Sequence, residues 1–165
     1  MDGVEGMEVP PTVVEGIAGH LTQPTDPLDC PAAPPELPAS SGRPARPVPD
    51  DVRVAVACRD AGFNEAVPAG TLTAHAFLDE PQRLVAAVNG ATPPADGVWN
   101  CAADSGATDL IVFTGPVTGT TTVAVTRTGC RWMHSSFGGT LLTPDAVTHA
   151  LSALDAPLAR LTPAA

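Results

Sequence analysis

The sequence predicts an α+β domain: a small antiparallel sheet with two helices packed on it, stapled by two disulfides, behind a proline-rich N-terminal arm. Three observations predict this class. The strand-like segments cluster instead of alternating with helices, which is typical of α+β folds. The four cysteines form two widely spaced pairs. Eleven prolines lie in the first 49 residues and eight in the remaining 116, and such density favours an extended arm.

The length of 165 residues fits one domain with a tail. We expect residues 1–29 to be a flexible, proline-containing arm, because they carry too little apolar surface to offset the entropy of ordering. Residues 30–160 are expected to form a single disulfide-stabilised α+β domain. Within it, residues 30–49 are a proline-rich loop that Cys30 ties on.

In the first half of the domain, apolar alternation predicts a strand over residues 52–58. Residues 71–73 are expected to form a second, short strand. A helix follows, with Asp79 as the N-cap, Pro81 in the first turn and Asn89-Gly90 at its end.

In the second half, strands are predicted over residues 98–101, 108–113 and 120–126, and the loop 114–119 joins the last two as a hairpin. Residues 131–137 are expected to add an edge strand. The final helix begins with Thr143 as the N-cap and Pro144 at the first helical position. Its apolar stripe is Val147, Ala150 or Leu151, Leu154 and Leu158.

The cysteine spacing favours two structural disulfides over a zinc ribbon or a redox centre. Four cysteines allow three pairings. Cys101 and Cys130 flank the predicted hairpin almost symmetrically, so they are expected to face each other on adjacent strands. Cys58 ends the first strand and leaves Cys30 as its partner. Two disulfides place the protein in an oxidising compartment.

The formal net charge is −10, and all eight basic residues are arginine. So few positive charges argue against nucleic acid and against an anionic membrane surface as partners. No stretch of the sequence is long and apolar enough to span a membrane. The N-terminus lacks a signal-peptide pattern, which conflicts with an oxidising compartment. We therefore expect that an upstream signal or membrane anchor is missing from this chain.

Catalysis and metal binding find little support, so we expect no enzyme, no cofactor and no metal. Ser105 lies between Asp104 and Asp109, but Asp-Ser-Gly is first a turn signature, and no nucleophile-elbow motif occurs. Cys130 and His134 have ligand spacing, but zinc requires a second close pair.

The candidate interaction segment is residues 131–139, because it contains the residue types typical of interface anchors. These are Arg131, Trp132, Met133, His134 and Phe137. In the alternative, Trp132 and Phe137 face the core from an edge strand. Trp99 and Trp132, each close to a cysteine, either pack on the disulfides as core or form a surface platform for a sugar or a peptide. The loop 114–119 is also expected to be exposed.

The residues that carry a family resemblance are the four cysteines and their flanks: Cys30-Pro-Ala, a Val-rich strand ending in Cys58-Arg, Cys101-Ala-Ala-Asp-Ser-Gly and Gly129-Cys130. Over residues 30–155 this pattern resembles a group of actinobacterial secreted proteins and lipoproteins of unknown function. The resemblance implies an extracytoplasmic location and no particular activity. This chain differs in lacking the leader and in having Arg131-Trp132-Met133 after the last cysteine.

Two functions are therefore expected from the sequence. The first is a non-catalytic extracytoplasmic binding domain, tethered by its arm, that acts as a monomer on an unidentified protein or cell-envelope ligand. The alternative is a secreted protease inhibitor or a small hydrolase, by analogy with small two-disulfide subtilisin inhibitors. Their short cysteine spacing is not matched here.

Overall fold

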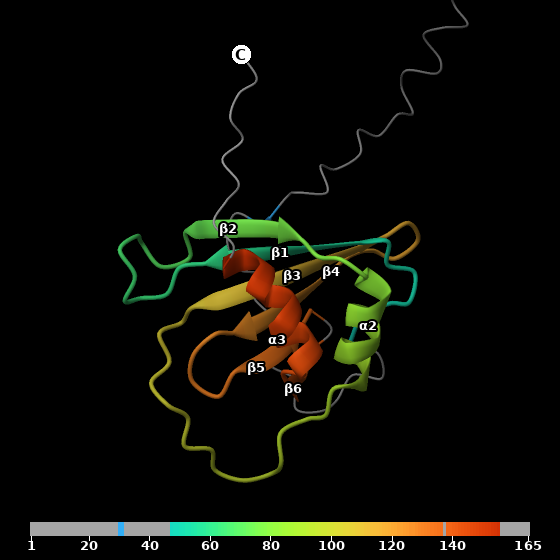
Figure 1. Cartoon of the computed structure of the whole chain (residues 1–165). Coiled ribbons are helices and arrows are strands. Elements are labelled where there is room, and N and C mark those ends of the chain that lie inside the picture. Colours follow the sequence, from blue (N-terminus) through green and yellow to red (C-terminus); the bar gives the residue numbers. More distant parts are fainter. Residues whose placement is uncertain (1–29, 32–46, 137, 156–165) are drawn as a thin grey trace, which may run out of the picture.

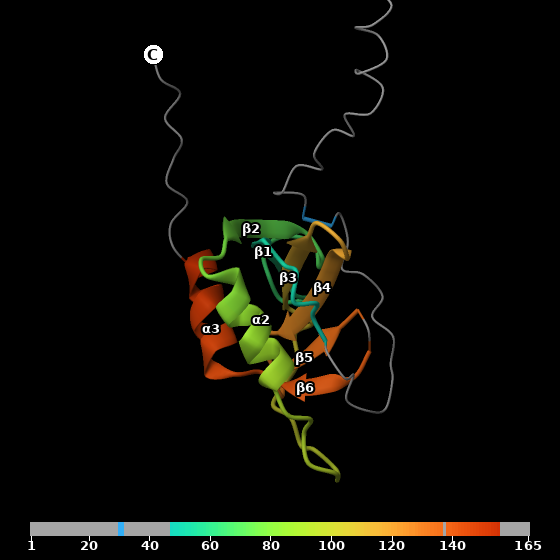
Figure 2. The ribbon, with the colours of Figure 1, turned by 90° about the vertical axis from the view of Figure 1, so that its right-hand side faces the viewer.

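A computed structural model of the chain describes residues 30–31, 47–136 and 138–155. They form a six-stranded antiparallel sheet with two helices on one of its faces (Figures 1 and 2). The elements in chain order are β1 (Val54–Asp60), β2 (Leu72–Phe77), α2 (Pro81–Gly90), β3 (Thr108–Gly115), β4 (Gly119–Thr126), β5 (Trp132–Ser135), β6 (Thr140–Leu142), α3 (Asp145–Leu151) and the 3₁₀ turn η1 (Ser152–Asp155). The strand order is β2-β1-β3-β4-β5-β6. The predicted α+β class with an antiparallel sheet and two helices is confirmed.

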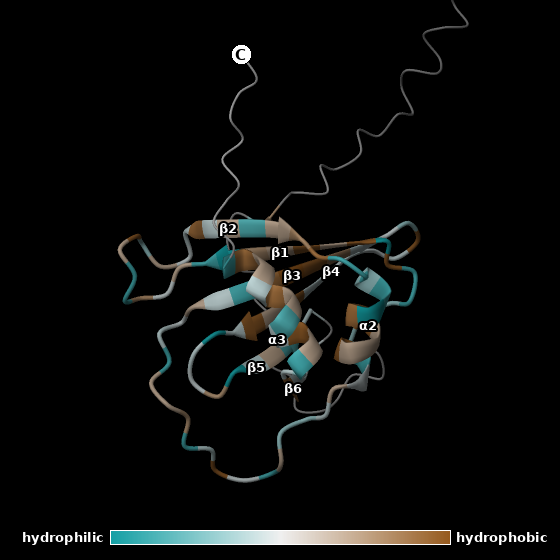
Figure 3. Cartoon of the chain, viewed as in Figure 1, coloured by the Kyte–Doolittle hydropathy of each residue, from teal (hydrophilic) through white to brown (hydrophobic). Residues whose placement is uncertain are grey.

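The main core lies between the sheet and the two helices. Strand β3 contributes Ile111 and Phe113, both fully buried, and the helices contribute the predicted apolar stripes. Figure 3 shows the apolar residues gathered along the central strands and on the sides of the helices that face them. The buried helical residues are Leu84, Val85, Val88, Val147 and Leu151, with Leu154 from η1. Burial of this amphipathic surface is the main source of stability in such a layer.

The central strands are also apolar on the face away from the helices. Val56, Cys58, Leu110, Val112 and Ala124 form a second buried cluster there, and Cys30 packs against it. Side chains of a strand alternate between the two faces of the sheet, and both faces are buried here, so β1 and β3 are nearly continuous apolar stretches of sequence. The disulfide at Cys58 therefore fastens the start of the proline-rich segment to the far face of the sheet.

The end of the same segment is fixed on the helical side. Val48 is fully buried in the main core. The side-chain amide of Asn89 accepts a hydrogen bond from the Val48 N–H (2.9 Å) and donates one to the Val48 carbonyl (2.7 Å). Most of the predicted loop 30–49 lies outside the described residues, as does the arm 1–29.

Both predicted cysteine pairs lie at disulfide distance, with Cα–Cα separations of 5.8 Å for Cys30–Cys58 and 4.9 Å for Cys101–Cys130. The expectation that Cys101 and Cys130 face each other on adjacent strands is wrong. The β3–β4 ladder ends at the pair Thr108–Thr126, so both cysteines lie in the loops beyond it. This disulfide therefore ties two loops together instead of crosslinking the hairpin.

The helix starts differ from the predictions. The N-cap of α2 is Glu80, not Asp79, and its side chain makes no capping hydrogen bond. The proline at position 81 disfavours a right-handed helical conformation for Glu80, which adopts φ 51° instead. Pro144, predicted at the first helical position, is the N-cap of α3, which displaces Thr143 from that role. The end of the predicted stripe, at Leu158, lies outside the described residues.

Two strand predictions also need correction. Residues 98–101 form no strand and lie in an exposed loop, because no neighbouring strand pairs with them. The segment predicted as an edge strand is β5, which pairs on both sides, since the three-residue β6 covers its other edge. The four strands β1 to β4 were predicted as strands, and their boundaries differ from the predicted ones by a few residues.

Candidate interaction surface

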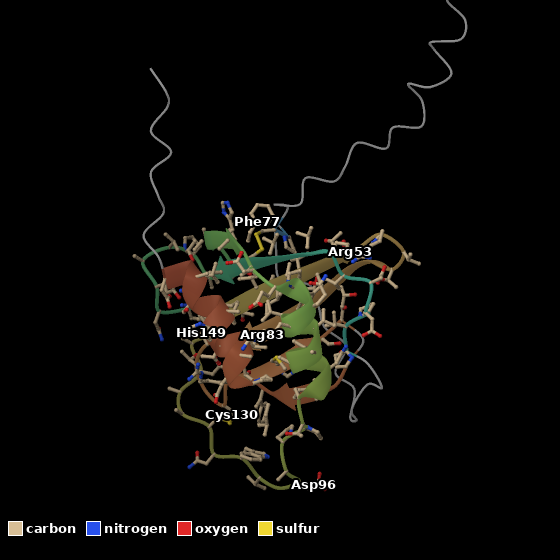
Figure 4. All side chains as sticks on the ribbon, turned by 45° about the vertical axis from the view of Figure 1, so that its right-hand side comes forward. Arg53, Phe77, Arg83, Asp96, Cys130 and His149 are labelled. Atoms are coloured by element: carbon tan, nitrogen blue, oxygen red, sulfur yellow. A yellow bond between two sulfur atoms is a disulfide. The ribbon has the colours of Figure 1, made fainter. Side chains whose placement is uncertain are left out.

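The loop between α2 and β3 carries the largest exposed apolar side chains at one end of the molecule. It spans residues 91–107 without regular structure and extends away from the sheet (Figure 1). Figure 4 shows Asp96 in this loop at the end of the domain opposite Phe77. Val98 is fully exposed and Trp99 is 46% exposed. Exposed apolar side chains that gather in one patch are typical of contact surfaces.

Trp99 stacks against Trp132, which lies on β5. The ring centroids are 6.1 Å apart and the planes meet at 88°, which is an edge-to-face pair. The indole N–H of Trp99 donates a hydrogen bond to the Ala95 carbonyl (2.9 Å). Trp132 is opposite Leu142 in the β5–β6 ladder, and Leu142 is 39% exposed. We call Val98, Trp99, Trp132 and Leu142 the tryptophan patch.

The backbone that carries the tryptophan patch is fixed on both sides. Cys101, two residues after Trp99, is bonded to Cys130, two residues before Trp132. Further along the loop, the Ser105 N–H donates a hydrogen bond to the Thr128 hydroxyl (2.9 Å). The Thr128 hydroxyl in turn donates to the Asp104 carboxylate (3.0 Å). The two indoles are therefore held in place before any partner arrives.

The residues of the predicted interaction segment do not all lie on the surface. Arg131 is exposed and adopts φ 53°, a left-handed conformation that is rare outside glycine. Trp132 is half-buried and belongs to the tryptophan patch. The prediction of Met133 as an interaction residue is wrong. Its side chain is fully buried in the main core, because strand alternation turns it to the face opposite Trp132. Phe137 lies outside the described residues.

His134 is half-buried on the same sheet face as Trp132. Its Nδ1 shares a hydrogen bond with the Thr140 hydroxyl (3.2 Å). Burial lowers the pKa of His134 below its usual value. The side chain therefore favours the neutral imidazole and supports the β5–β6 hairpin, so it adds no charge to the surface.

The predicted hairpin loop is present between β3 and β4, and Val117 at its tip is exposed. The Asp51 carboxylate accepts hydrogen bonds from the N–H groups of Val117 (2.9 Å) and Thr118 (3.0 Å) and from the Thr118 hydroxyl. These bonds lower the pKa of Asp51, with the Thr118 hydroxyl as the largest cause. A Cβ at Gly115 would lie 2.7 Å from this carboxylate, so a larger residue there would displace the Asp51 side chain from the loop. This loop offers a single valine and no aromatic residue.

Ser105, the serine weighed as a nucleophile, has its hydroxyl 3.1 Å from the Thr128 hydroxyl. Its hydrogen-bond partner within the described residues is Thr128 and not a histidine, and among the same residues no group of three histidine, cysteine, aspartate or glutamate side chains could hold a metal ion. Within the part of the chain that the structure covers, this serine is part of a turn that anchors the loop.

A buried ion pair connects β1 and β3. The Arg59 guanidinium donates two hydrogen bonds of 2.8 Å to the two oxygens of Asp109, its direct cross-strand partner. The side chain of Asp109 is 3% exposed. This bidentate contact raises the pKa of Arg59 further above its already high value. Asp109 therefore balances a charge that the fold has taken out of water.

Asp60, at the end of β1, is buried and its Oδ2 has no hydrogen-bond partner in the described part of the chain. Burial, and next the nearby Asp109 carboxylate, raise the pKa of Asp60 above 3.8. The folded state thus holds this proton to a higher pH than the unfolded chain does. The resulting cost in stability is absent below pH 3.8, grows as the pH rises, and is complete above the folded pKa.

We therefore expect Asp60→Asn to raise the free energy of unfolding at pH 7 by about 1 kcal/mol, because it removes a buried negative charge whose Oδ2 has no hydrogen-bond partner and which the nearby Arg127 offsets only in part. The gain should shrink towards pH 4. Urea denaturation at both values measures it, with Asp96→Asn in the exposed loop as the matched control. A variant less stable than the parent chain at pH 7 would contradict this description of Asp60.

Comparison with known proteins identifies no relative: no family model, no curated protein and no solved structure matches the chain. Among the described residues, no helix has the length and apolar character needed to cross a membrane. The function must therefore be argued from the surface itself.

Proposed function

We propose that this chain is a non-catalytic extracytoplasmic binding domain that holds its partner through the tryptophan patch. The observation that carries the proposal is the edge-to-face pair of Trp99, on a loop that a disulfide fixes to the domain, and Trp132, on β5, with ring centroids 6.1 Å apart. Tryptophan is the residue type most enriched among the residues that dominate binding energy.

The patch is suited to binding because it is already ordered. Ordering side chains at an interface costs about 0.5–1.5 kcal/mol for each flexible side chain, and a fixed surface avoids that cost. Val98 adds a fully exposed apolar side chain next to Trp99 in the chain, and Arg131 is an exposed residue next to Trp132 in the chain. A partner that presents an aromatic or aliphatic surface beside an acidic group would match this combination.

The two disulfide-distance cysteine pairs support the extracytoplasmic part of the proposal, since structural disulfides persist in oxidising compartments. The proline-rich arm supports a tethered position, because proline-rich chains act as semi-rigid spacers. The resemblance to actinobacterial secreted proteins and lipoproteins agrees with both. The partner is then a protein or another component of the cell envelope, bound by a monomer.

Trp99→Ala tests this function. We expect the variant to keep its free energy of unfolding within about 1 kcal/mol, because half of this side chain is in water. When each protein is immobilised on beads, the variant should fail to capture the envelope component that the parent chain captures. Phe77→Ala, an aromatic of similar exposure at the opposite end of the domain, should capture it normally. Equal capture by both variants would refute the tryptophan patch as the contact surface.

A protease inhibitor is the second candidate, and one observation favours it. Residues 95–103 are all exposed on a convex loop that the Cys101–Cys130 disulfide holds. A protease would engage this loop from outside, and Val98 is its most exposed side chain. Inhibition assays against subtilisin-like and chymotrypsin-like enzymes decide between the candidates: slow cleavage after Val98 or Trp99 with tight inhibition would replace the binding-domain proposal.

A further inference from the structure

Strand β2 forms one edge of the sheet, and its outer side is open. Among the described residues it pairs with β1 alone, and no other element lies along its outer side (Figures 1 and 2). Its six residues, Leu72–Phe77, include no proline and no formal charge. Natural proteins usually protect a sheet edge by such residues, by a short strand or by a covering segment, because an open edge pairs with another strand.

The opposite edge of the sheet is protected. Strand β6 has only three residues. In addition, the N–H of Leu142 at its end donates a hydrogen bond to the Thr92 carbonyl (2.8 Å). The described part of the chain therefore covers one edge of the sheet and leaves the other free for a further strand.

The β1–β2 ladder identifies the backbone groups that β2 leaves free. The N–H of Leu78, directly after β2, donates to the Ala55 carbonyl of β1 (2.9 Å). Consecutive residues of an antiparallel strand direct their backbone groups to alternate sides, so those of Phe77 and His75 point away from β1. Thr73 has no partner in the ladder, so the regular part of the edge begins after it. The edge thus presents the N–H and carbonyl groups of two alternate residues, which is the pattern that another extended strand pairs with.

We propose that this edge pairs with the same edge of a second copy of the chain, antiparallel and around a two-fold axis at Ala76. In this register His75 of each copy lies opposite Phe77 of the other, so each free N–H meets a free carbonyl. Both side chains lie on the sheet face away from the helices, where the phenyl ring and the imidazole become cross-strand neighbours. On the helical face Ala76 lies opposite its own copy, and its small side chain allows the strands to approach.

The side chains along the edge favour a second copy as the occupant. Phe77 is 53% exposed, and the neighbouring strand would cover part of its ring. No like charges meet within the paired strands, because β2 carries no formal charge. The nearest acidic residue after β2 is Asp79, and this register places it opposite Thr73 of the copy. The edge is therefore complementary to itself, as a two-fold interface requires.

The pairing is expected to be weak, with a dissociation constant on the order of 0.1 mM, because the contact is one short strand. The net charge of −10 on each copy opposes it further. In dilute solution the chain remains a monomer, as in the proposed function. The inference does not rest on that function, since Phe77 lies at the end of the domain opposite the loop that carries Trp99 (Figure 4). Copies tethered close together would pair and present two tryptophan patches at once.

Sedimentation equilibrium of the full chain from about 1 µM to about 1 mM tests the pairing, and we expect a monomer–dimer equilibrium. His75→Pro removes an outward N–H, which edge strands tolerate, and should weaken dimerisation at least about tenfold. His75→Gln keeps that N–H and is the matched control, with a dissociation constant within about threefold of the parent value. The proposal is overturned if no dimer forms at about 1 mM, or if His75→Pro dimerises as strongly as the parent chain.

Hydrogen exchange of the parent chain, followed by NMR, tests the same contact without a substitution. The N–H groups of His75 and Phe77 should exchange fast at about 20 µM and be protected at about 1 mM. The N–H of Leu78, which is bonded to β1, should be protected at both concentrations. Protection of His75 and Phe77 already in dilute solution would show that another part of the chain covers this edge, which contradicts the proposal. Trp99→Ala should dimerise as the parent chain does, so a failure of the proposed function leaves this result unchanged.

Discussion

Replacing Asp109 with alanine is expected to lower the free energy of unfolding by about 3–5 kcal/mol, because it leaves a buried arginine without its partner. The Arg59 side chain is 16% exposed and donates to both oxygens of Asp109. Arg127 lies beside the same carboxylate. Two guanidinium groups would thus lose their common counter-charge. Urea denaturation at pH 7 measures the change.

Asp155→Ala is the matched control for Asp109→Ala, since it removes an exposed carboxylate from the same arginine. Exposed ion pairs contribute about 0–1 kcal/mol, so this variant should be nearly as stable as the parent chain. A further variant, Arg59→Met with Asp109→Leu, replaces the pair by apolar side chains and should recover most of the loss. Equal losses in the two single-aspartate variants would contradict the buried role of Asp109.

Phe113→Ala is expected to cost about 3–5 kcal/mol, the usual range for deleting a fully buried phenylalanine. Its ring lies in the main core between β3 and the helices, with no exposed area. Phe63→Ala is the control, because that ring is 76% exposed and its loss should cost less than about 1 kcal/mol. A change below about 1 kcal/mol for Phe113→Ala would show that the core is not packed as described.

The sequence predicted the parts of the fold that local pattern determines. Alternation of valines found β1 and β4, and the stripe of Leu84, Val85 and Val88 found α2. The short β6 could not be found this way, because three residues are too few for a periodic pattern. The pairing of Cys101 with Cys130 was predicted correctly, although both cysteines lie in loops and not on the strands. The prediction succeeded because the two loops that flank the hairpin are also placed almost symmetrically about it.

The candidate surface was predicted only in part. The prediction for residues 131–139 rested on their composition, and composition cannot show that Met133 faces the core. Strand alternation does show it, because neighbouring residues of a strand, such as Trp132 and Met133, point to opposite faces of the sheet. The contact between Trp99 and Trp132 joins residues far apart in the chain. A signal for it was present, because the two indoles are placed symmetrically, two residues outside the paired cysteines. The Arg59–Asp109 pair had no such signal, because it depends on the β1–β3 register.

The most direct measurement of the central claim is site-specific photo-crosslinking in the presence of the cell envelope of the source organism. A photo-reactive residue replaces Val98 in one preparation and Val117 in another; both valines are exposed on loops, at the tryptophan patch and at the β3–β4 hairpin respectively. We expect a discrete adduct from position 98 and none from position 117. Adducts from position 117 alone, or equally from both positions, would show that the tryptophan patch is not the binding surface.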